Sequence, residues 1–220
     1  MRILILQSAT HLQISNLKGL VIIDRIMSHG NIYKMGAGIL PATIRNGKLW
    51  FLFGKENQYE KSAPGFSDFG GGVENDETPL ETAAREGGEE LTGFLGSGQH
   101  IKQILMKTGT YNIDSPANKY RTHIFPMKYD PYLERYYNNN QLFIQKYLDP
   151  AIIKSSRIFE KAEIRWICVD DLSKMRPQFR HFYVDVINQI LEQKDEITKF
   201  IKGTRNGKAP GSGTRKRRYR

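Results

Sequence analysis

The chain has 220 residues, of which 39% are hydrophobic and 25% charged, and its formal net charge is +10. This length and apolar content suffice for one domain with a buried core plus extensions. A single cysteine, Cys168, excludes an intrachain disulfide, and we expect it to be a buried strand thiol. No apolar run approaches the length of a membrane span, and the opening run is too short for a signal peptide. We therefore expect a soluble intracellular protein that lies in the cytoplasm, with nuclear entry through its basic end as an alternative.

Residues 1–35 are expected to form an extension ahead of the main domain. Two short apolar segments, residues 1–7 and 19–27, have the composition of strands. A turn between them and the main domain at residues 28–31 would allow an extra hairpin. Met27 and Met35 are alternative starts of the chain.

Residues 36–53 have the pattern of a β-hairpin. Two apolar runs, 36–44 and 48–53, flank Arg45-Asn46-Gly47, and an Asn-Gly pair favours the tight turn that joins antiparallel strands. Both faces of the second run are apolar, as expected for a strand in the middle of a sheet.

The next stretch, residues 70–94, places a glycine-rich turn before a helix. Thr78 suits the N-cap, Pro79 suits the first helical position, and Glu81 completes a capping box. The helix should end at Thr92-Gly93. The positions expected to pack on the core share one face: Leu80, Ala84, Gly87 and Leu91.

Three carboxylates occupy a separate face of that helix. Glu86, Glu89 and Glu90 stand at i, i+3 and i+4, which places them within an arc of about 100°. Like charges this close repel one another, so the cluster is unfavourable unless a cation lies among them. Mg²⁺ and Mn²⁺ prefer carboxylate and carbonyl oxygens. The sequence therefore predicts a divalent metal site.

The same stretch resembles the Nudix box, G-x5-E-x7-R-E-U-x-E-E-x-G-U, in which U is an aliphatic residue. The residues that match in register are Gly71, Glu77, Arg85, Glu86, Glu89 and Glu90. Six fixed positions at average residue usage match a random window about once in 10⁷. Three positions depart: Gly87 replaces the aliphatic residue, Thr92 stands where glycine is expected, and the glycine comes one residue late at Gly93. We interpret these departures as packing variations that leave the carboxylates untouched.

The resemblance covers about residues 35–201 and implies an α/β fold, an α/β/α sandwich with a mixed β-sheet. It also implies a pyrophosphohydrolase that uses Mg²⁺ or Mn²⁺ to cleave the diphosphate link of a nucleoside diphosphate derivative. The residues implied to hold the metal and act in catalysis are Glu86, Glu89 and Glu90. Those implied to support the box structurally are Gly71, Glu77 and Arg85, with Arg85 paired to Glu77. A polar loop at residues 57–67 would border the substrate pocket. Lys55, just before it, is a candidate phosphate contact, with a solvated lysine as the alternative.

The general base is not fixed by the motif. It could be a box carboxylate, Glu89 or Glu90, or a carboxylate from a later loop. The later candidates, for which surface salt bridging is the more common explanation, are Glu134, Glu160 and Glu163. The histidines show no metal-ligand spacing, and His123 is expected to be packed in a strand.

Two strands and an insertion are expected after the helix. Residues 103–111 and 120–128 have strand composition, joined by a loop at residues 112–119. The insertion, around residues 130–150, is expected to be helical but broken at Asn138-Asn139-Asn140. Its tyrosines could stack on a base, although tyrosines that pack a helix are more common.

The main domain should close with a strand at residues 163–169 and a helix at 177–193 that continues to 201. We place the domain boundary at residue 202. Residues 203–220 are rich in glycine and carry seven Lys or Arg and no acid, so we expect a disordered basic tail. Such a tail could bind nucleic acid or direct nuclear entry, or it could be only a solvated end.

Three functions follow from these patterns together with the resemblance. The first is a pyrophosphohydrolase acting on a small nucleotide derivative. The second is the same chemistry on capped mRNA, with the basic tail and the tyrosine-rich insertion holding the RNA. The third is a Nudix-fold binding module without turnover, which the intact Glu86, Glu89 and Glu90 argue against. Substrate identity and oligomeric state lie beyond the sequence.

Overall fold

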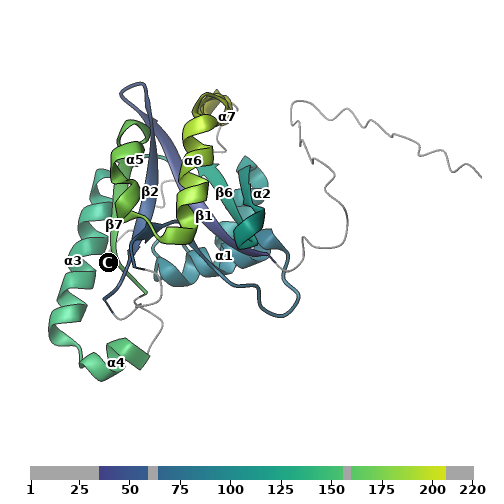
Figure 1. Ribbon diagram of the computed structural model, residues 1–220. Coiled ribbons are helices and arrows are strands. Elements are labelled where there is room, and N and C mark those ends of the chain that lie inside the picture. The colour runs from purple at the N-terminus through teal and green to yellow at the C-terminus, as the bar shows by residue number, and fades with distance from the viewer. Residues whose placement is uncertain (1–34, 59–63, 156–159, 207–220) are drawn as a thin grey trace, which may run out of the picture.

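The computed structural model describes residues 35–58, 64–155 and 160–206 (Figure 1). The expected N-terminal hairpin and the basic end of the tail lie outside these residues. No helix in the described ranges is long and apolar enough to cross a membrane.

A mixed β-sheet forms the middle of the molecule. The long strands follow the order β7-β2-β1-β6-β5; β1 and β6 run parallel, and the other pairs are antiparallel. The strands of the described residues are β1 (Gly36–Arg45), β2 (Lys48–Glu56), β3 (Phe66–Ser67), β4 (Phe69–Gly71), β5 (Tyr111–Ser115), β6 (Tyr120–Pro126) and β7 (Lys161–Cys168).

The predicted hairpin is confirmed as β1 and β2. Asn46 and Gly47 both have positive φ, 50° and 78°, the conformation that a two-residue turn between antiparallel strands requires. Near the turn, β1 pairs with β2 directly. Farther from the turn the two strands separate, so that β4 pairs with β1 and β3 pairs with β2. The segment that leads into α1 is thereby built into the sheet.

Helices cover both faces of the sheet, which makes the expected α/β/α sandwich. Residues of α5, α6 and α7 pack on one face of the sheet, and residues of α1, α2 and α3 pack on the other. The helices are α1 (Pro79–Glu90), α2 (Gly98–Thr108), α3 (Pro131–Tyr147), α4 (Pro150–Ser155), α5 (Val169–Met175), α6 (Val184–Glu192) and α7 (Lys194–Asn206).

Alternate side chains of strand β2 contribute to the hydrophobic cores on the two faces of the sheet. Phe51 and Phe53 point into a core shared with Ile187 of α6 and other residues of α5 to α7. Leu52, between them, points into a second core shared with α1 to α3. Alternate side chains of a strand face opposite sides of a sheet, so an unbroken apolar run indicates burial on both.

Two expectations between α1 and β6 were wrong. Residues 103–111 are mostly helix α2 rather than a strand, because Ile101 and Leu105 are buried four residues apart and Ser97 caps the start through a bond from the His100 N–H. The first half of the expected loop at residues 112–119 belongs to strand β5, and a short 3₁₀ turn, Pro116–Asn118, follows it.

The insertion differs from expectation in a similar way. Helix α3 runs without a break through the three asparagines. The Asn138 side chain donates to the Ile164 carbonyl at 2.9 Å and accepts from the Ile164 N–H at 2.8 Å. These tertiary bonds outweigh the weak helix propensity of asparagine.

The end of the domain also has different boundaries. The closing helix begins at Val184 rather than at residue 177, because short 3₁₀ turns, Arg176–Gln178 and His181–Tyr183, bury Phe179 and Tyr183 before it. Helix α7 continues to Asn206, five residues beyond the end expected at residue 201.

Candidate active site

Helix α1 starts as the sequence predicts. The Thr78 side chain accepts a bond from the Glu81 N–H, and the Glu81 carboxylate accepts one from the Thr78 N–H at 2.9 Å. This capping box fixes the first turn, and with it the direction in which the later carboxylates point.

The two glycines in the middle of α1 allow close packing. A Cβ on Gly87 would lie 2.3 Å from Cδ1 of Ile39 on β1. A Cβ on Gly88 would lie 2.8 Å from the backbone nitrogen of Gly98, at the start of α2. Helix α1 thus lies closer to β1 and α2 than a side chain at either position would permit, which accounts for the departure at Gly87.

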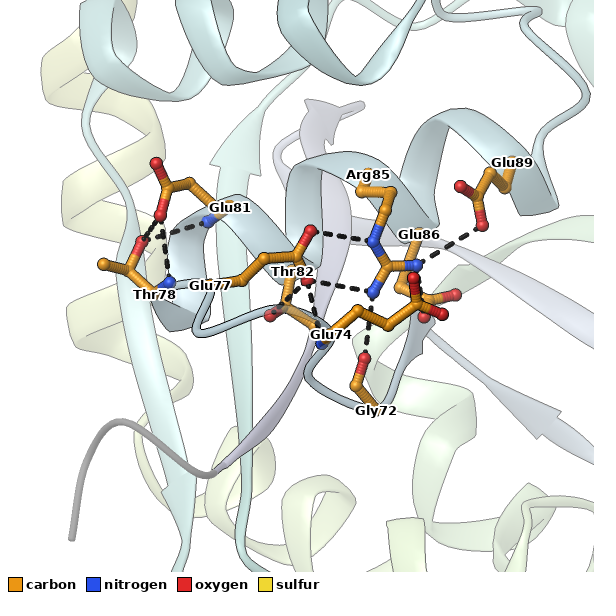
Figure 2. Close-up of polar contacts among 9 residues, drawn as sticks. All are labelled: Gly72, Glu74, Glu77, Thr78, Glu81, Thr82, Arg85, Glu86 and Glu89. Atoms are coloured by element: carbon orange, nitrogen blue, oxygen red, sulfur yellow. Dashed lines mark hydrogen bonds and ion pairs between the residues drawn. The ribbon is translucent and has the colours of Figure 1, made fainter.

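Arg85 joins the turn before α1 to the helix itself (Figure 2). Its Nε and Nη2 donate to the two Glu77 oxygens at 2.8 and 3.0 Å, and Nη2 also donates to the Gly72 carbonyl at 2.9 Å. The expected pairing of Arg85 with Glu77 is therefore present and bidentate. Its hydrogen bonds to Glu77 hold the pKa of that carboxyl below its ordinary value.

Two of the three predicted metal-binding carboxylates contact Arg85. Its Nη1 lies 2.8 Å from Glu86 Oε1 and 3.4 Å from Glu89 Oε2. The Glu86 carboxylate also fills the space beside Gly71, where an added Cβ would lie 2.5 Å from Oε1. Burial raises the pKa of Glu86 against the effect of Arg85, and the charges of Glu89 and Glu160 raise it further.

The third carboxylate, Glu90, points into the molecule. It is 3% exposed, and its Oε1 lies 3.1 Å from the ammonium of Lys161, which is fully buried. Lys161 also donates to Glu56 and, at 3.2 Å, to Ser67 Oγ. Burial raises the pKa of Glu90 well above its ordinary value, and Lys161 opposes that shift only in part. Glu86 and Glu89 thus share one cation of the protein, and Glu90 has another.

Sequence reasoning did not find the residues around Glu90. Glu56, Lys161 and Arg180 come from three segments far apart in the chain, and Arg180 Nη1 donates to Glu56 Oε1 at 2.6 Å. No motif links these positions, because only the pairing of β2 with β7 brings Glu56 opposite Lys161. Once the register of β7 is known, Lys161 is seen to occupy an inward-facing position of the strand, and a buried lysine indicates a carboxylate partner.

A cleft of about 770 Å³ opens beside this cluster. Its lining includes Lys55 and Glu56 of β2, Asn138 and Leu142 of α3, and Glu163 of β7. Residues at both ends of the 57–67 loop also line it: Asn57, Gln58, Pro64 and Gly65. Lys55 lies at the cleft with its ammonium 3.9 Å from Glu163, where it could meet a phosphate.

The three later candidates for the general base have different partners in the structure. Glu134 accepts a bond from the Trp166 N–H at 3.0 Å and so serves the edge of β7. Glu163 contacts Lys55 and Arg165. Glu160 interacts electrostatically with Glu86. His123 is packed in β6, as expected, where burial lowers its pKa to about 4.

The donor chemistry around α1 fits a divalent cation. Six carboxylates and three cations interact here, a formal charge of −3: Glu56, Glu77, Glu86, Glu89, Glu90 and Glu160 with Arg85, Lys161 and Arg180. Buried Glu90 Oε2 has no hydrogen-bond partner within the described part of the chain. Within the described residues, no group of three or more Asp, Glu, His or Cys side chains is arranged so that it could hold a metal ion. A cation would therefore have to draw Glu86 and Glu89 away from Arg85.

Comparison with known proteins gives limited matches. No family model matches the chain. A stretch of 58 residues, 26% of the chain, is 46% identical to the uncharacterized protein L534 of Acanthamoeba polyphaga mimivirus, and it covers only 19% of that protein's length.

Similar solved structures are Nudix-type hydrolases. A Nudix hydrolase from M. smegmatis has a TM-score of 0.44 and 14% identity over 75% of this chain and 88% of that one. An Ap4A hydrolase from C. elegans has a TM-score of 0.39 and 14% identity over 76% and 97%. A MutT protein from Methanosarcina mazei Go1 has a TM-score of 0.38 and 19% identity over 77% and 99%. Scores at this level do not establish the family of the chain.

Proposed function

We propose that this chain is a metal-dependent pyrophosphohydrolase of the Nudix type, which cleaves the diphosphate link of a nucleoside diphosphate derivative. The observation that carries the proposal is the Arg85 network. It joins Glu77, the Gly72 carbonyl, Glu86 and Glu89 in one cluster beside a glycine-rich turn. A solvated acidic helix would have no need of a bidentate arginine that ties it to the preceding turn.

Glu86, Glu89 and Glu90 are the proposed metal-binding side chains. Mg²⁺ or Mn²⁺ bound there would neutralise phosphate oxygens and lower the pKa of a water. The excess negative charge of the cluster supports this assignment. Gly71, Glu77 and Arg85 are proposed to hold the carboxylates in place, and Lys55 to contact a phosphate at the cleft.

In the proposed reaction, water attacks one phosphorus and the bridging P–O bond breaks. The second phosphate leaves with the bridging oxygen, and the proton of the water passes to a carboxylate. Glu160 suits that role among the later carboxylates, because it interacts with Glu86 while Glu134 is bonded to β7. Glu89 is the alternative within the box, since Glu90 is buried against Lys161.

A product screen tests the activity. Purified protein with Mg²⁺ or Mn²⁺ is offered nucleoside triphosphates, dinucleoside polyphosphates, nucleotide sugars, ADP-ribose and capped RNA, and the products are separated. We expect hydrolysis of at least one substrate at a diphosphate link. Glu89→Gln and Glu90→Gln should each lose most of the turnover, because each removes a charge that holds the metal.

Glu192→Gln is the matched control, an exposed carboxylate on α6 in the other helical layer, and it should keep full activity. Full activity in folded Glu90→Gln would contradict the metal assignment. Binding of these nucleotides without product from any of them would favour the non-catalytic module.

A further inference from the structure

The outer face of α3 carries a stripe of exposed aromatic side chains. Four side chains stand at intervals of four, seven and four residues, which puts them on one side of the helix. Each is more than half exposed: Tyr132 56%, Tyr136 58%, Phe143 62% and Tyr147 66%. Tyr137, by contrast, is fully buried and bonds to backbone carbonyls of Glu90 and Lys161. Helix packing therefore explains one tyrosine of α3 and leaves the stripe unexplained.

The charges on this face all have one sign. Arg135 and Lys146 are exposed between the aromatic residues, together with Asn139 and Asn140. The helix has one carboxylate, Glu134, and it is turned toward β7, where it accepts the Trp166 N–H. None of the exposed residues of α3 is acidic. The face thus offers aromatic rings, amides and positive charge.

The rings are arranged in two pairs along the helix. Tyr132 and Tyr136 are stacked, with centroids 5.9 Å apart and planes at 23°, and Phe143 and Tyr147 lie 4.9 Å apart. Lys146 Nζ lies 5.1 Å from the centre of the Tyr147 ring. At 1.5 Å per residue the stripe is about 22 Å long. Proteins that bind single-stranded nucleic acid without sequence preference use aromatic rings that stack on the bases and cations that follow the phosphate backbone.

We propose that this face of α3 binds single-stranded RNA and directs its 5′ end into the cleft. Asn138 and Leu142 of the same helix line the cleft, so a strand on the stripe lies beside the candidate active site. RNA chains begin with a 5′ phosphoanhydride, the kind of bond that the proposed function cleaves, and the directing part of the inference rests on that function. Exposed Asn139 and Asn140 can bond to 2′-hydroxyls, which DNA lacks.

A second copy of the chain fits the face less well. A two-fold symmetric contact would bring the stripe against itself. Arg135 and Lys146 would then face cations, with no acid on the helix surface to pair with them. Charge complementarity favours a polyanion instead.

The test measures the binding of a 3′-labelled oligouridylate of about 12 nucleotides to the full chain, with fluorescence anisotropy as the readout. The double variant Tyr136→Ala/Tyr147→Ala should bind at least about tenfold more weakly, because stacking on each ring is lost. Arg135→Gln should reduce the slope of log affinity against log salt by about 0.7, the contribution of one phosphate contact on a single strand. An oligothymidylate of equal length should bind wild type more weakly.

Met106→Ala and Lys107→Gln are the matched controls, exposed apolar and basic residues on α2, and should leave binding unchanged. Each substituted residue is exposed, so circular dichroism should show native folds. Hydrolysis of a small nucleotide should also stay at the wild-type level in the tyrosine variant. The anisotropy result does not depend on turnover, so an inactive protein would count against the proposed function and not against the binding face.

Three results would overturn the inference. One is wild-type affinity for the oligouridylate in the tyrosine double variant. Another is equal affinity of the wild type for RNA and DNA, which would remove the assignment to RNA. The third is a wild-type dimer in analytical ultracentrifugation that becomes monomeric in the tyrosine variant, which would make the stripe a contact between copies.

Discussion

Arg85 makes more contacts than any lysine could reproduce. Its planar guanidinium bonds to both Glu77 oxygens and the Gly72 carbonyl while it also contacts Glu86 and Glu89. An ammonium group has no such fork, so Arg85→Lys should keep the charge and lose the geometry. We expect a loss of about 1–3 kcal/mol in the free energy of unfolding, measured by urea denaturation. Arg176→Lys, at an exposed turn, should be neutral, and equal stabilities of the two variants would show that the fork is unimportant.

Asp68 is a buried carboxylate outside the candidate active site. Tyr120 donates to its Oδ1 and Thr122 to its Oδ2, both at 2.8 Å. Burial raises its pKa from 3.8 to about 6, although these hydrogen bonds and Lys161 act in the opposite direction. An acid whose pKa is raised on folding stabilises the native state below its unfolded pKa. That stabilisation is lost as the pH rises through the folded pKa.

The stability of Asp68→Asn should therefore differ from wild type in a pH-dependent way. The wild type should lose roughly 3 kcal/mol relative to the variant as the pH rises from about 3 to 7, because the variant has no proton to release there. Urea denaturation of both proteins across that range measures the difference. A constant difference would mean that Asp68 has an ordinary pKa.

At the scale of elements, α3 protects the edge of the sheet. Glu134 and Asn138, one helical turn apart, bond to Trp166 and Ile164, two residues apart on β7. The spacings match, since four residues of helix and two of strand each span about 6 Å. Side chains of α3 thus replace the backbone partners that an edge strand lacks.

Removing the Asn138 amide should expose that edge. Asn138→Ala leaves the Ile164 N–H and carbonyl without partners, and we expect a loss of about 2–4 kcal/mol in unfolding free energy. Hydrogen exchange at the Ile164 amide should also be faster. Asn140→Ala, exposed on the same helix, should change stability by no more than about 0.5 kcal/mol. A similar small effect at Asn138 would show that water replaces its bonds.

The contact between α1 and α2 gives a second test at this scale. In an exposed helix, glycine to alanine stabilises by up to about 1 kcal/mol. A Cβ on Gly88 would lie 2.8 Å from the Gly98 nitrogen, so Gly88→Ala should instead destabilise by about 1–3 kcal/mol. Gly203→Ala on α7, with nothing within 4 Å of the added Cβ, should show the plain gain of alanine. Thermal denaturation of the two variants should shift in opposite directions, and a gain at both would mean that the helices can separate.

Local patterns predicted the elements whose causes are local. The capping box at Thr78 and the Asn46-Gly47 turn follow from a few neighbouring residues, and both are confirmed. The break expected in α3 was wrong because Asn138 is stabilised by a strand 26 residues away. The partners of Glu90 were out of reach for the same reason: Lys161 meets it only after β7 has paired with β2. Sequence reasoning therefore found the acidic face and Arg85, and it missed Lys161, the cation that contacts Glu90.

At the scale of the whole molecule, the candidate site is a place where folding leaves charge uncompensated. Six carboxylates face three cations, so the native state holds more negative charge together than the unfolded chain would. A divalent ion that binds only the folded arrangement should stabilise it, by about 2.7 kcal/mol at a concentration of 100 times its Kd. We expect Mg²⁺ or Mn²⁺ to raise the midpoint of urea denaturation, and a chelator to reverse the change.

The same titration locates the ion. Glu86→Gln and Glu89→Gln should each reduce the shift of the midpoint, because each removes a proposed ligand, whereas Glu192→Gln should keep the full shift. Arg85→Lys should have two opposing effects on Mg²⁺ binding. The arginine no longer competes with the ion for Glu86 and Glu89, but those carboxylates are also less firmly held in place. An ion that stabilises wild type and the Glu86 and Glu89 variants equally would lie elsewhere. Glu86 and Glu89 would then be partners of Arg85 alone, and the acidic face of α1 would be a structural feature rather than a metal site.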